Sequence, residues 1–258
     1  MRKLIAAGIL SAAMAGPSGL LAEEAMTDAE RTTLHEEIRA YLLENPEIIM
    51  EMIAILDAQK EADAAATDLD LVAQNSQSIF DDGFSHVAGN PDGAFTVVEF
   101  VDYQCGYCRR AHPEVQELIE TDGDIRLIVK EMPILGPGSE LAARAAISTL
   151  ISEGGEAYEK LNHAFMGMQG QIDDASLDAT LVEVGLDPSE IRAGMQDDEV
   201  TRRLAETQRL ARDLQISGTP TFVIGNRMVR GYMPLDGMEQ LVTEPVSYTH
   251  LTLPTKIV

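Results

Sequence analysis

The sequence predicts an α/β fold in which a long helical insertion separates the strands of a mixed β-sheet, with a helical extension at the N-terminus. Three observations lead to this fold class. Two apolar, β-branched segments flank one helical segment between residues 95 and 132. The pattern is then helical from 139 to about 214, and strand character returns at 220–232. Apolar residues at helical spacing also occur at 27–60, ahead of the first strand.

The composition is that of an acidic chain with one sizeable core. Of its 258 residues 45% are hydrophobic, which is enough for one domain and an appendage. The 43 acidic residues outnumber the 19 Lys and Arg residues and give a net charge of -24. Nucleic acid and anionic membranes bind basic surfaces, so we expect neither as a main partner. With only two cysteines, the chain has no disulfide framework and no four-thiolate zinc site.

Residues 1–22 are predicted to be a signal peptide. Arg2 and Lys3 form a short basic region, and residues 4–15 form an apolar run that is too short to span a bilayer. We expect cleavage after Ala22, with a competing site after residue 15 and an uncleaved N-terminal anchor as the alternatives. In either case the chain is exported, so its thiols meet an oxidising environment.

Residues 23–80 are predicted to form a helical arm and a linker. A capping box at Thr27 and Glu30 starts one helix, and Asn45 with Pro46 ends it and starts a second. The apolar stripes of the two helices are Leu34, Ile38 and Leu42, then Ile49, Met52, Ile53 and Leu56. The segment is too small to bury both stripes, which must pack on the main domain or on another copy of the chain.

The main domain, residues 81–245, begins its predicted sheet after a turn signal at 90–93. A buried strand at 95–103 leads into Cys105 and a helix to about residue 120, and a second strand follows at 125–132. One helix between two strands makes a βαβ unit with a parallel pair. Cys105 therefore lies at the carboxyl end of a parallel strand, where open α/β sheets place their chemistry.

A helical insertion at about 138–215 separates this unit from the rest of the sheet. Glycines and an Asp-Pro step divide it, and its last helix is expected to run from 191 to 214. A hairpin within 220–232 and a helix from 235 to 244 complete the domain. Residues 246–258 lack any connected pattern and resemble translated adapter or vector sequence, so we expect a non-native tail.

Cys105 and Cys108 are spaced to close a small disulfide ring at a helix start. The first sulfur lies beside unsatisfied backbone N–H groups and the positive end of the helix dipole, which favour thiolate over thiol. In such sites the thiol pKa falls from about 8.5 to between roughly 3.5 and 7. We therefore expect Cys105 to be the nucleophile and Cys108 to resolve the mixed disulfide. The redox-active Cys105–Cys108 pair needs no further cofactor.

Other interpretations of the two cysteines are less favourable. A zinc site of Cys105, Cys108 and His112 lacks a fourth ligand nearby, so no metal site is predicted. Haem attachment of the c type needs histidine where Arg109 stands. An inert structural disulfide would gain little from so short a loop. The two thiolates are also soft ligands suited to Cu(I), which leaves a copper-binding protein as the alternative function.

The run from Glu99 to Arg110 (EFVDYQCGYCRR) and the segment 218–222 (GTPTF) resemble the DsbA family of exported thiol:disulfide oxidoreductases. The resemblance covers about residues 80–245. It implies a thioredoxin-like fold with an inserted helical domain and a periplasmic location. It also implies unfolded or misfolded exported proteins as substrates, and a membrane redox partner that resets the Cys105–Cys108 pair.

The resemblance further implies roles for residues around the cysteines. Thr219 and Pro220 would form a cis peptide bond facing the sulfurs, with the backbone of Thr219 pairing with an extended substrate. Gly106 and Tyr107, between the cysteines, would support that site. Glu99, six residues before Cys105, would accept or relay the proton of Cys108. Alternation along the strand leaves open whether Glu99 points outward instead.

The direction of exchange stays open between forming and isomerising disulfides. Gly106 and Tyr107, and Thr219 before the predicted cis proline, resemble the disulfide isomerases more than the strongest oxidases. The helices at 27–60 are similar to the oligomerising arm of isomerase-like relatives linked to copper tolerance. A homo-oligomer formed through residues 27–60 would enclose a cleft for misfolded chains. His112 and His163 are interpreted as surface or packing residues.

Overall fold

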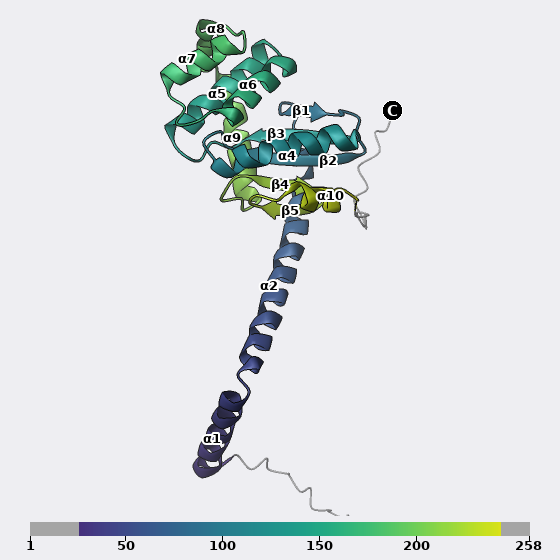
Figure 1. Ribbon diagram of the computed structural model, residues 1–258, viewed down its shortest axis with the longest axis vertical. Coiled ribbons are helices and arrows are strands. Elements are labelled where there is room, and N and C mark those ends of the chain that lie inside the picture. The colour runs from purple at the N-terminus through teal and green to yellow at the C-terminus, as the bar shows by residue number, and fades with distance from the viewer. Residues whose placement is uncertain (1–25, 244–258) are drawn as a thin grey trace, which may run out of the picture. The chain divides into compact units, whose positions relative to one another are not determined.

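The computed structural model describes residues 26–243, and Figure 1 shows their helices and strands, most of them labelled. The predicted signal peptide at 1–22 and the predicted tail at 246–258 lie outside the described residues. The chain divides into two compact units, Met1–Ala58 and Gln59–Val258. None of the helices among residues 26–243 combines the length and the apolar character that crossing a membrane requires.

The described part of the first unit consists of α1 (Asp28–Glu44) and the beginning of α2 (Glu47–Gln74). The predicted capping box is present. The Thr27 hydroxyl oxygen accepts from the Glu30 N–H at 3.3 Å, and the Glu30 carboxylate accepts from the Thr27 N–H at 2.8 Å. Six of the predicted stripe residues stay between 44% and 53% exposed in the single chain, namely Leu34, Ile38, Ile49, Met52, Ile53 and Leu56.

The second unit is built on one mixed sheet with the strand order β1-β3-β2-β4-β5. The strands are β1 (His86–Gly89), β2 (Phe95–Val101), β3 (Ile125–Glu131), β4 (Thr221–Ile224) and β5 (Arg227–Arg230). Strands β2 and β3 are parallel, and β4 is antiparallel to β2 and β5, which confirms the predicted βαβ unit and hairpin. Strand β1, which was not predicted, pairs antiparallel with β3. Its four residues are too few to show a period of two.

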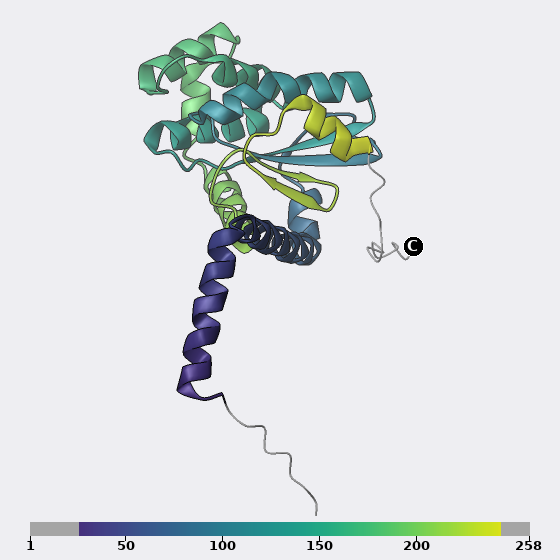
Figure 2. The same ribbon diagram turned by 60° about the horizontal axis from the view of Figure 1, so that its bottom comes forward.

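Different helices cover the two faces of the sheet, because successive strand residues point to opposite faces. The helices of this unit are α3 (Ser76–Phe80), α4 (Gly106–Asp122), α5 (Pro137–Ser152), α6 (Gly155–Gly167), α7 (Asp174–Glu183), α8 (Pro188–Gly194), α9 (Asp198–Asp213) and α10 (Leu235–Thr243). Helices α4 and α10 lie over the face that carries Val97 and Leu127 (Figure 2). The opposite face, with Val98 and Ile128, packs against residues of α2, α3 and α9.

The segment 59–80, predicted to belong to the arm and its linker, takes part in the core of the second unit. Val72 and Ile79 are 1% and 0% exposed and lie in the cluster on the second face. The Asp68 carboxylate also accepts a hydrogen bond from Arg230 Nη2 at 2.8 Å. The end of α2 is thereby attached to β5.

The helical insertion differs from prediction in its last part. The single helix expected over 191–214 is wrong, because α8 ends at Gly194 and α9 begins at Asp198. Asp198 and Glu199 stand in the first turn of α9, where acidic side chains stabilise a new helix start through its dipole. Between the two helices Met195 is buried, 3% exposed.

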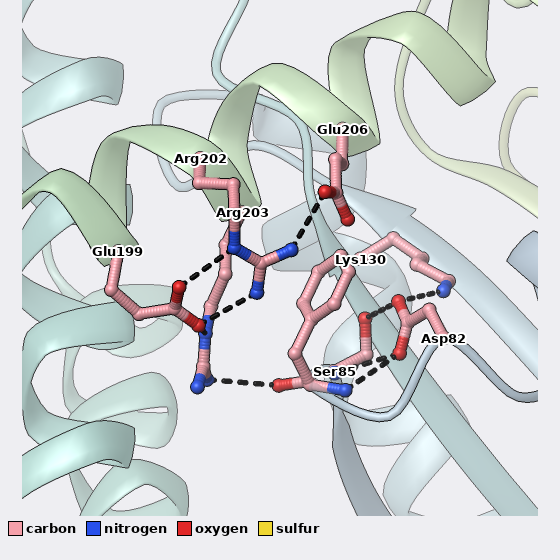
Figure 3. Close-up of polar contacts among 8 residues, drawn as sticks. Asp82, Ser85, Lys130, Glu199, Arg202, Arg203 and Glu206 are labelled. Carbon is pink, nitrogen blue, oxygen red and sulfur yellow. Dashed lines mark hydrogen bonds and ion pairs between the residues drawn. The ribbon is translucent and has the colours of Figure 1, made fainter.

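A cluster of charged residues fixes the segment between α3 and β1 (Figure 3). Lys130 of β3 is fully buried and forms an ion pair with Asp82. The Asp82 carboxylate accepts from the Phe84 N–H at 3.0 Å. From α9, Arg203 donates to the Phe84 carbonyl at 3.1 Å and to Glu199 at 2.8 Å. Side chains from β3 and α9, together with Asp82 of the segment itself, thus hold the start of β1 in place.

Candidate active site

The two cysteines lie at the N-terminus of α4, directly after β2. Cys105 is the N-cap residue and is 7% exposed, whereas Cys108, in the first turn, is completely buried. Both are free thiols. The Cys105 thiol donates to the Thr219 carbonyl oxygen at 3.1 Å. The Thr219–Pro220 peptide bond is cis, which confirms what the family resemblance implied.

The surroundings of the two sulfurs give the two thiols very different pKa values. Hydrogen bonding to the Cys108 thiol lowers the pKa of Cys105 to about 5, with further help from the backbone N–H groups of Cys108 and Tyr107. Burial acts against this shift without cancelling it. The pKa of Cys108 is raised well above its ordinary value by the interaction with Cys105, by burial and by the charge of Glu99. At neutral pH the site therefore holds one thiolate and one thiol.

The low pKa of Cys105 predicts a distinctive alkylation profile. In the reduced, folded protein the rate of Cys105 modification by iodoacetamide should reach half its maximum near pH 5. In the urea-unfolded chain the midpoint should return to about 8.5. Peptide mapping separates Cys105 from Cys108, which should stay unmodified while folded. A folded-state midpoint near the unfolded value would contradict this description of the site.

Glu99 lies beneath the cysteines on β2. Its side chain is 3% exposed, which excludes the outward orientation that the sequence left open. It shares the α4-facing side of the sheet with Val97 and Val101. Burial, followed by the charge of Glu131, raises the pKa of Glu99 to about 8. Its Oε1 atom has no hydrogen-bond partner within the described part of the chain.

Asp102 organises the loops around the site, a role that the sequence did not predict. It is 1% exposed and accepts four hydrogen bonds from residues that the structure describes. The donors are Gln104 N–H at 2.7 Å, Ser139 Oγ at 2.7 Å, Ile134 N–H at 2.8 Å and Leu135 N–H at 3.0 Å. The carboxylate thus attaches the loop before α5 to the residues that directly precede Cys105. No periodicity could reveal this role, because three of the four donors lie more than 30 residues away in sequence.

Apolar side chains stand exposed around the buried sulfurs. Tyr107 is 61% exposed, and Ile134 and Leu135, next to the Asp102 carboxylate, are 41% and 54% exposed. A side chain at Gly106 would meet no other atom within 4 Å. The Thr219 hydroxyl oxygen is buried without a hydrogen-bond partner among the described residues. The site therefore combines reactive sulfur with an apolar, accessible margin.

His112 does not join the cysteines. Its Nε2 atom lies 2.6 Å from Nδ1 of His163 on α6, so the two rings pair with each other. Burial, together with His163, lowers the pKa of His112 to about 4. Among residues 26–243 no three His, Cys, Asp or Glu side chains gather in a geometry that suits a metal ion. The arrangement gives the zinc interpretation no support.

Two family models match the chain. The DSBA-like thioredoxin domain matches residues 96–243, which is more than half of the sequence. The copper resistance protein ScsC N-terminal domain matches residues 30–63, within α1 and α2. The two matches fall on different parts of the chain, one containing the cysteines and the other the exposed apolar stripes.

Known proteins and structures resemble the chain to different extents. A thioredoxin-like oxidoreductase from Silicibacter pomeroyi DSS-3 is 41% identical, with a TM-score of 0.62 over 65% of this chain and 95% of its own. A linker-deletion variant of Proteus mirabilis ScsC is 26% identical, with a TM-score of 0.66 over 86% of this chain and 97% of its own.

Among curated proteins, the Na(+)/H(+) antiporter NhaA 1 of Salinispora arenicola is 30% identical over 168 residues, or 64% of this chain. The chain spans about a quarter of the length of that antiporter. The fold, the site and the match over residues 96–243 lead to one conclusion: the chain belongs to the DSBA-like thioredoxin domain family, with an ScsC-type N-terminal segment.

Proposed function

We propose that this protein is an exported, periplasmic thiol:disulfide oxidoreductase that forms or isomerises disulfides in secreted proteins through Cys105 and Cys108. One observation carries the proposal: a thiol with a pKa of about 5 stands at a helix start, one turn from a buried thiol whose pKa is raised. In such a pair the sulfur with the low pKa, here that of Cys105, is both a good nucleophile and a good leaving group.

The proposed reaction begins with the oxidised protein. A substrate thiolate attacks Cys105, forms a mixed disulfide and releases Cys108 as a thiolate, which takes a proton from Glu99. A second substrate thiolate then attacks the substrate sulfur of the mixed disulfide, and Cys105 leaves as a stable thiolate. Two electrons pass from the substrate to the protein, and Glu99 regains its proton from solvent. A membrane redox partner would reoxidise the pair.

The margin of the site supports a peptide substrate. An extended segment would pair with the backbone of Thr219, in the manner of strand addition, and contact Tyr107, Ile134 and Leu135. These side chains offer apolar contacts without demanding one sequence, as a protein that acts on unfolded or misfolded exported chains requires.

Refolding assays test the function. The protein should accelerate both the oxidative refolding of reduced ribonuclease and the recovery of scrambled ribonuclease, relative to a glutathione buffer alone. Equilibration with glutathione then gives the redox potential of the Cys105–Cys108 pair, which indicates the direction of exchange. A strongly oxidising potential favours bond donation, and a lower one favours isomerisation. A protein that adds nothing to the buffer in both assays would overturn the proposal.

A homo-oligomer formed through residues 27–60 is the second part of the proposal. It rests on the stripe residues of α1 and α2, which a single chain leaves exposed, and on the ScsC-type match over 30–63. Deletion of residues 23–60 should lower the mass measured by light scattering to that of a monomer. An intact protein that is already monomeric would rule this arm out as an interface.

Cu(I) binding is a second candidate function, which the description of the ScsC-type match favours. Cys105 and Cys108 are soft ligands, and among the described residues no further metal ligands join them. We therefore expect at most a two-thiolate site. Titration of the reduced protein with Cu(I) against a competing chelator measures it, and weak binding together with normal thiol exchange would exclude this candidate.

A further inference from the structure

A second buried carboxyl group lies near Glu99. Glu131 is the last residue of β3 and is 6% exposed. Its Oε1 atom accepts hydrogen bonds from the hydroxyl groups of Tyr103 at 2.7 Å and Tyr158 at 2.6 Å. Its Oε2 atom has no partner among residues 26–243. Buried polar atoms are nearly always paired, so this carboxyl group needs an explanation.

The strand register places the two carboxyl groups on one face of the sheet. In the parallel pair, Glu99 stands opposite Val129 and Glu131 stands opposite Val101. Residues two apart on a strand point to the same side, so both carboxyl groups project toward α4. In each carboxyl group one oxygen atom lacks a hydrogen-bond partner within residues 26–243. Two charged carboxylates in such a position repel each other, and a single proton held by the pair removes that repulsion.

The hydrogen bonds decide which member of the pair carries the charge. Two hydroxyl donors stabilise a negative Glu131, whereas Oε1 of Glu99 receives no donor from the described residues. A cavity of about 20 Å³ also lies beside Glu131, lined by His86, Tyr158, Arg203 and Thr207 among others. That volume admits one water molecule with several polar partners.

We propose that Glu131 is a positioning residue for disulfide exchange: it forms a buried carboxyl pair with Glu99 in which Glu131 carries the negative charge and Glu99 carries the proton. The inference rests on the proposed function, in which Glu99 serves Cys108. It also says which of the two opposite steps at Cys108 the pair favours, its release or its attack. A protonated Glu99 supplies the proton when Cys108 leaves as a thiolate, and it delays the reverse step, in which Cys108 must first lose its own proton.

The order of titration agrees with this assignment. Burial raises the pKa of Glu131 to about 7, and burial plus the Glu131 charge raises the pKa of Glu99 to about 8. The titratable groups facing the pair are Cys108 of α4, Tyr103 and Asp102 beyond β2, and Tyr158 of α6. His86 of β1 and Arg203 of α9 line the adjoining cavity.

The resolution of a mixed disulfide tests the pair. Cys105 is first linked to glutathione, and quenched-flow alkylation follows the attack of Cys108, which releases glutathione thiolate and one proton. In the native protein the rate should rise with pH through a midpoint near 8. In Glu131→Gln the midpoint should fall by about one unit or more, because the neighbouring charge is gone. At pH 7 resolution should therefore become up to about tenfold faster.

Controls separate this result from a structural effect. The amide introduced by Glu131→Gln keeps an oxygen that accepts from both tyrosines, and circular dichroism should show an unchanged fold. Glu183→Gln, at an exposed position of α7, should leave rate and midpoint unchanged. Glu99→Gln should abolish the rise of the resolution rate with pH around that midpoint. Carbon-13 NMR of the glutamate carboxyl groups should show two coupled buried titrations in the native protein and one in Glu131→Gln.

The outcomes distinguish the two proposals. If the native midpoint persists in Glu131→Gln, the carboxyl pair is wrong even when the protein folds ribonuclease normally. If ribonuclease folding fails, the proposed function falls, but the glutathione experiment still measures the pair because it needs no protein substrate.

Discussion

Replacing Cys105 with serine is expected to abolish disulfide exchange. With a pKa of about 5, the Cys105 thiol is about 99% ionised at pH 7, whereas an ordinary thiol is only a few per cent ionised. A serine hydroxyl does not ionise at that pH and forms no disulfide, so neither the attack nor the mixed disulfide remains. The loss should be complete in both ribonuclease assays and in the reaction with glutathione.

Cys108→Ser is the matched variant for this experiment. It keeps the attacking sulfur and removes only the resolving one, so mixed disulfides with substrate should accumulate and be visible on non-reducing gels. Cys108→Ala, which removes the hydrogen-bond donor as well, should raise the pKa of Cys105, because hydrogen bonding to the Cys108 thiol is the largest contribution to its lowering. Full activity of Cys105→Ser in either assay would show that the exchange chemistry lies elsewhere.

Asp102→Ala is expected to produce the largest loss of stability at the site. The carboxylate accepts two hydrogen bonds on each oxygen, and three of the donors belong to the loop before α5 or to its first turn. Alanine leaves these buried donors without a partner. Hydrogen bonds to charged groups and unsatisfied buried donors suggest a decrease of about 3 to 4 kcal/mol in the free energy of unfolding. Urea denaturation followed by circular dichroism measures it.

Two further variants define the cause. Asp102→Asn retains one acceptor oxygen and should fall between alanine and the native protein. Glu183→Ala, at an exposed position of α7, should change stability by less than about 0.5 kcal/mol. An Asp102→Ala protein as stable as Glu183→Ala would mean that the four hydrogen bonds of this carboxylate contribute nothing in solution.

Much of the fold follows from the order of apolar patterns. Strands β2 and β3 and the β4–β5 hairpin were predictable because each run is long or is joined by a recognisable turn. Strand β1 was not, since HVAG becomes a strand only by pairing with β3. The division between α8 and α9 was also hidden, because apolar spacing continues across the buried Met195.

The candidate site divides in the same way. The spacing of Cys105 and Cys108 at a helix start predicts a reactive thiolate, and the GTPTF segment resembles a family pattern that implies the cis bond at Pro220. The inward orientation of Glu99 is shown only by its burial in the folded sheet. Asp102 and Glu131 carried no signal in the sequence, since an isolated acidic residue beside a strand is ordinarily solvated.

The sequence by itself determined the chemistry of Cys105, because the helix-start groups that stabilise its thiolate lie within one turn of the same chain. The tertiary structure decided what surrounds it. Thr219 reaches Cys105 across 114 residues, and Tyr158 reaches Glu131 across 27. The proton affinities of Glu99 and Glu131 depend on burial and on each other's charge. Such effects depend on distance in space, and only the folded sheet brings these groups together.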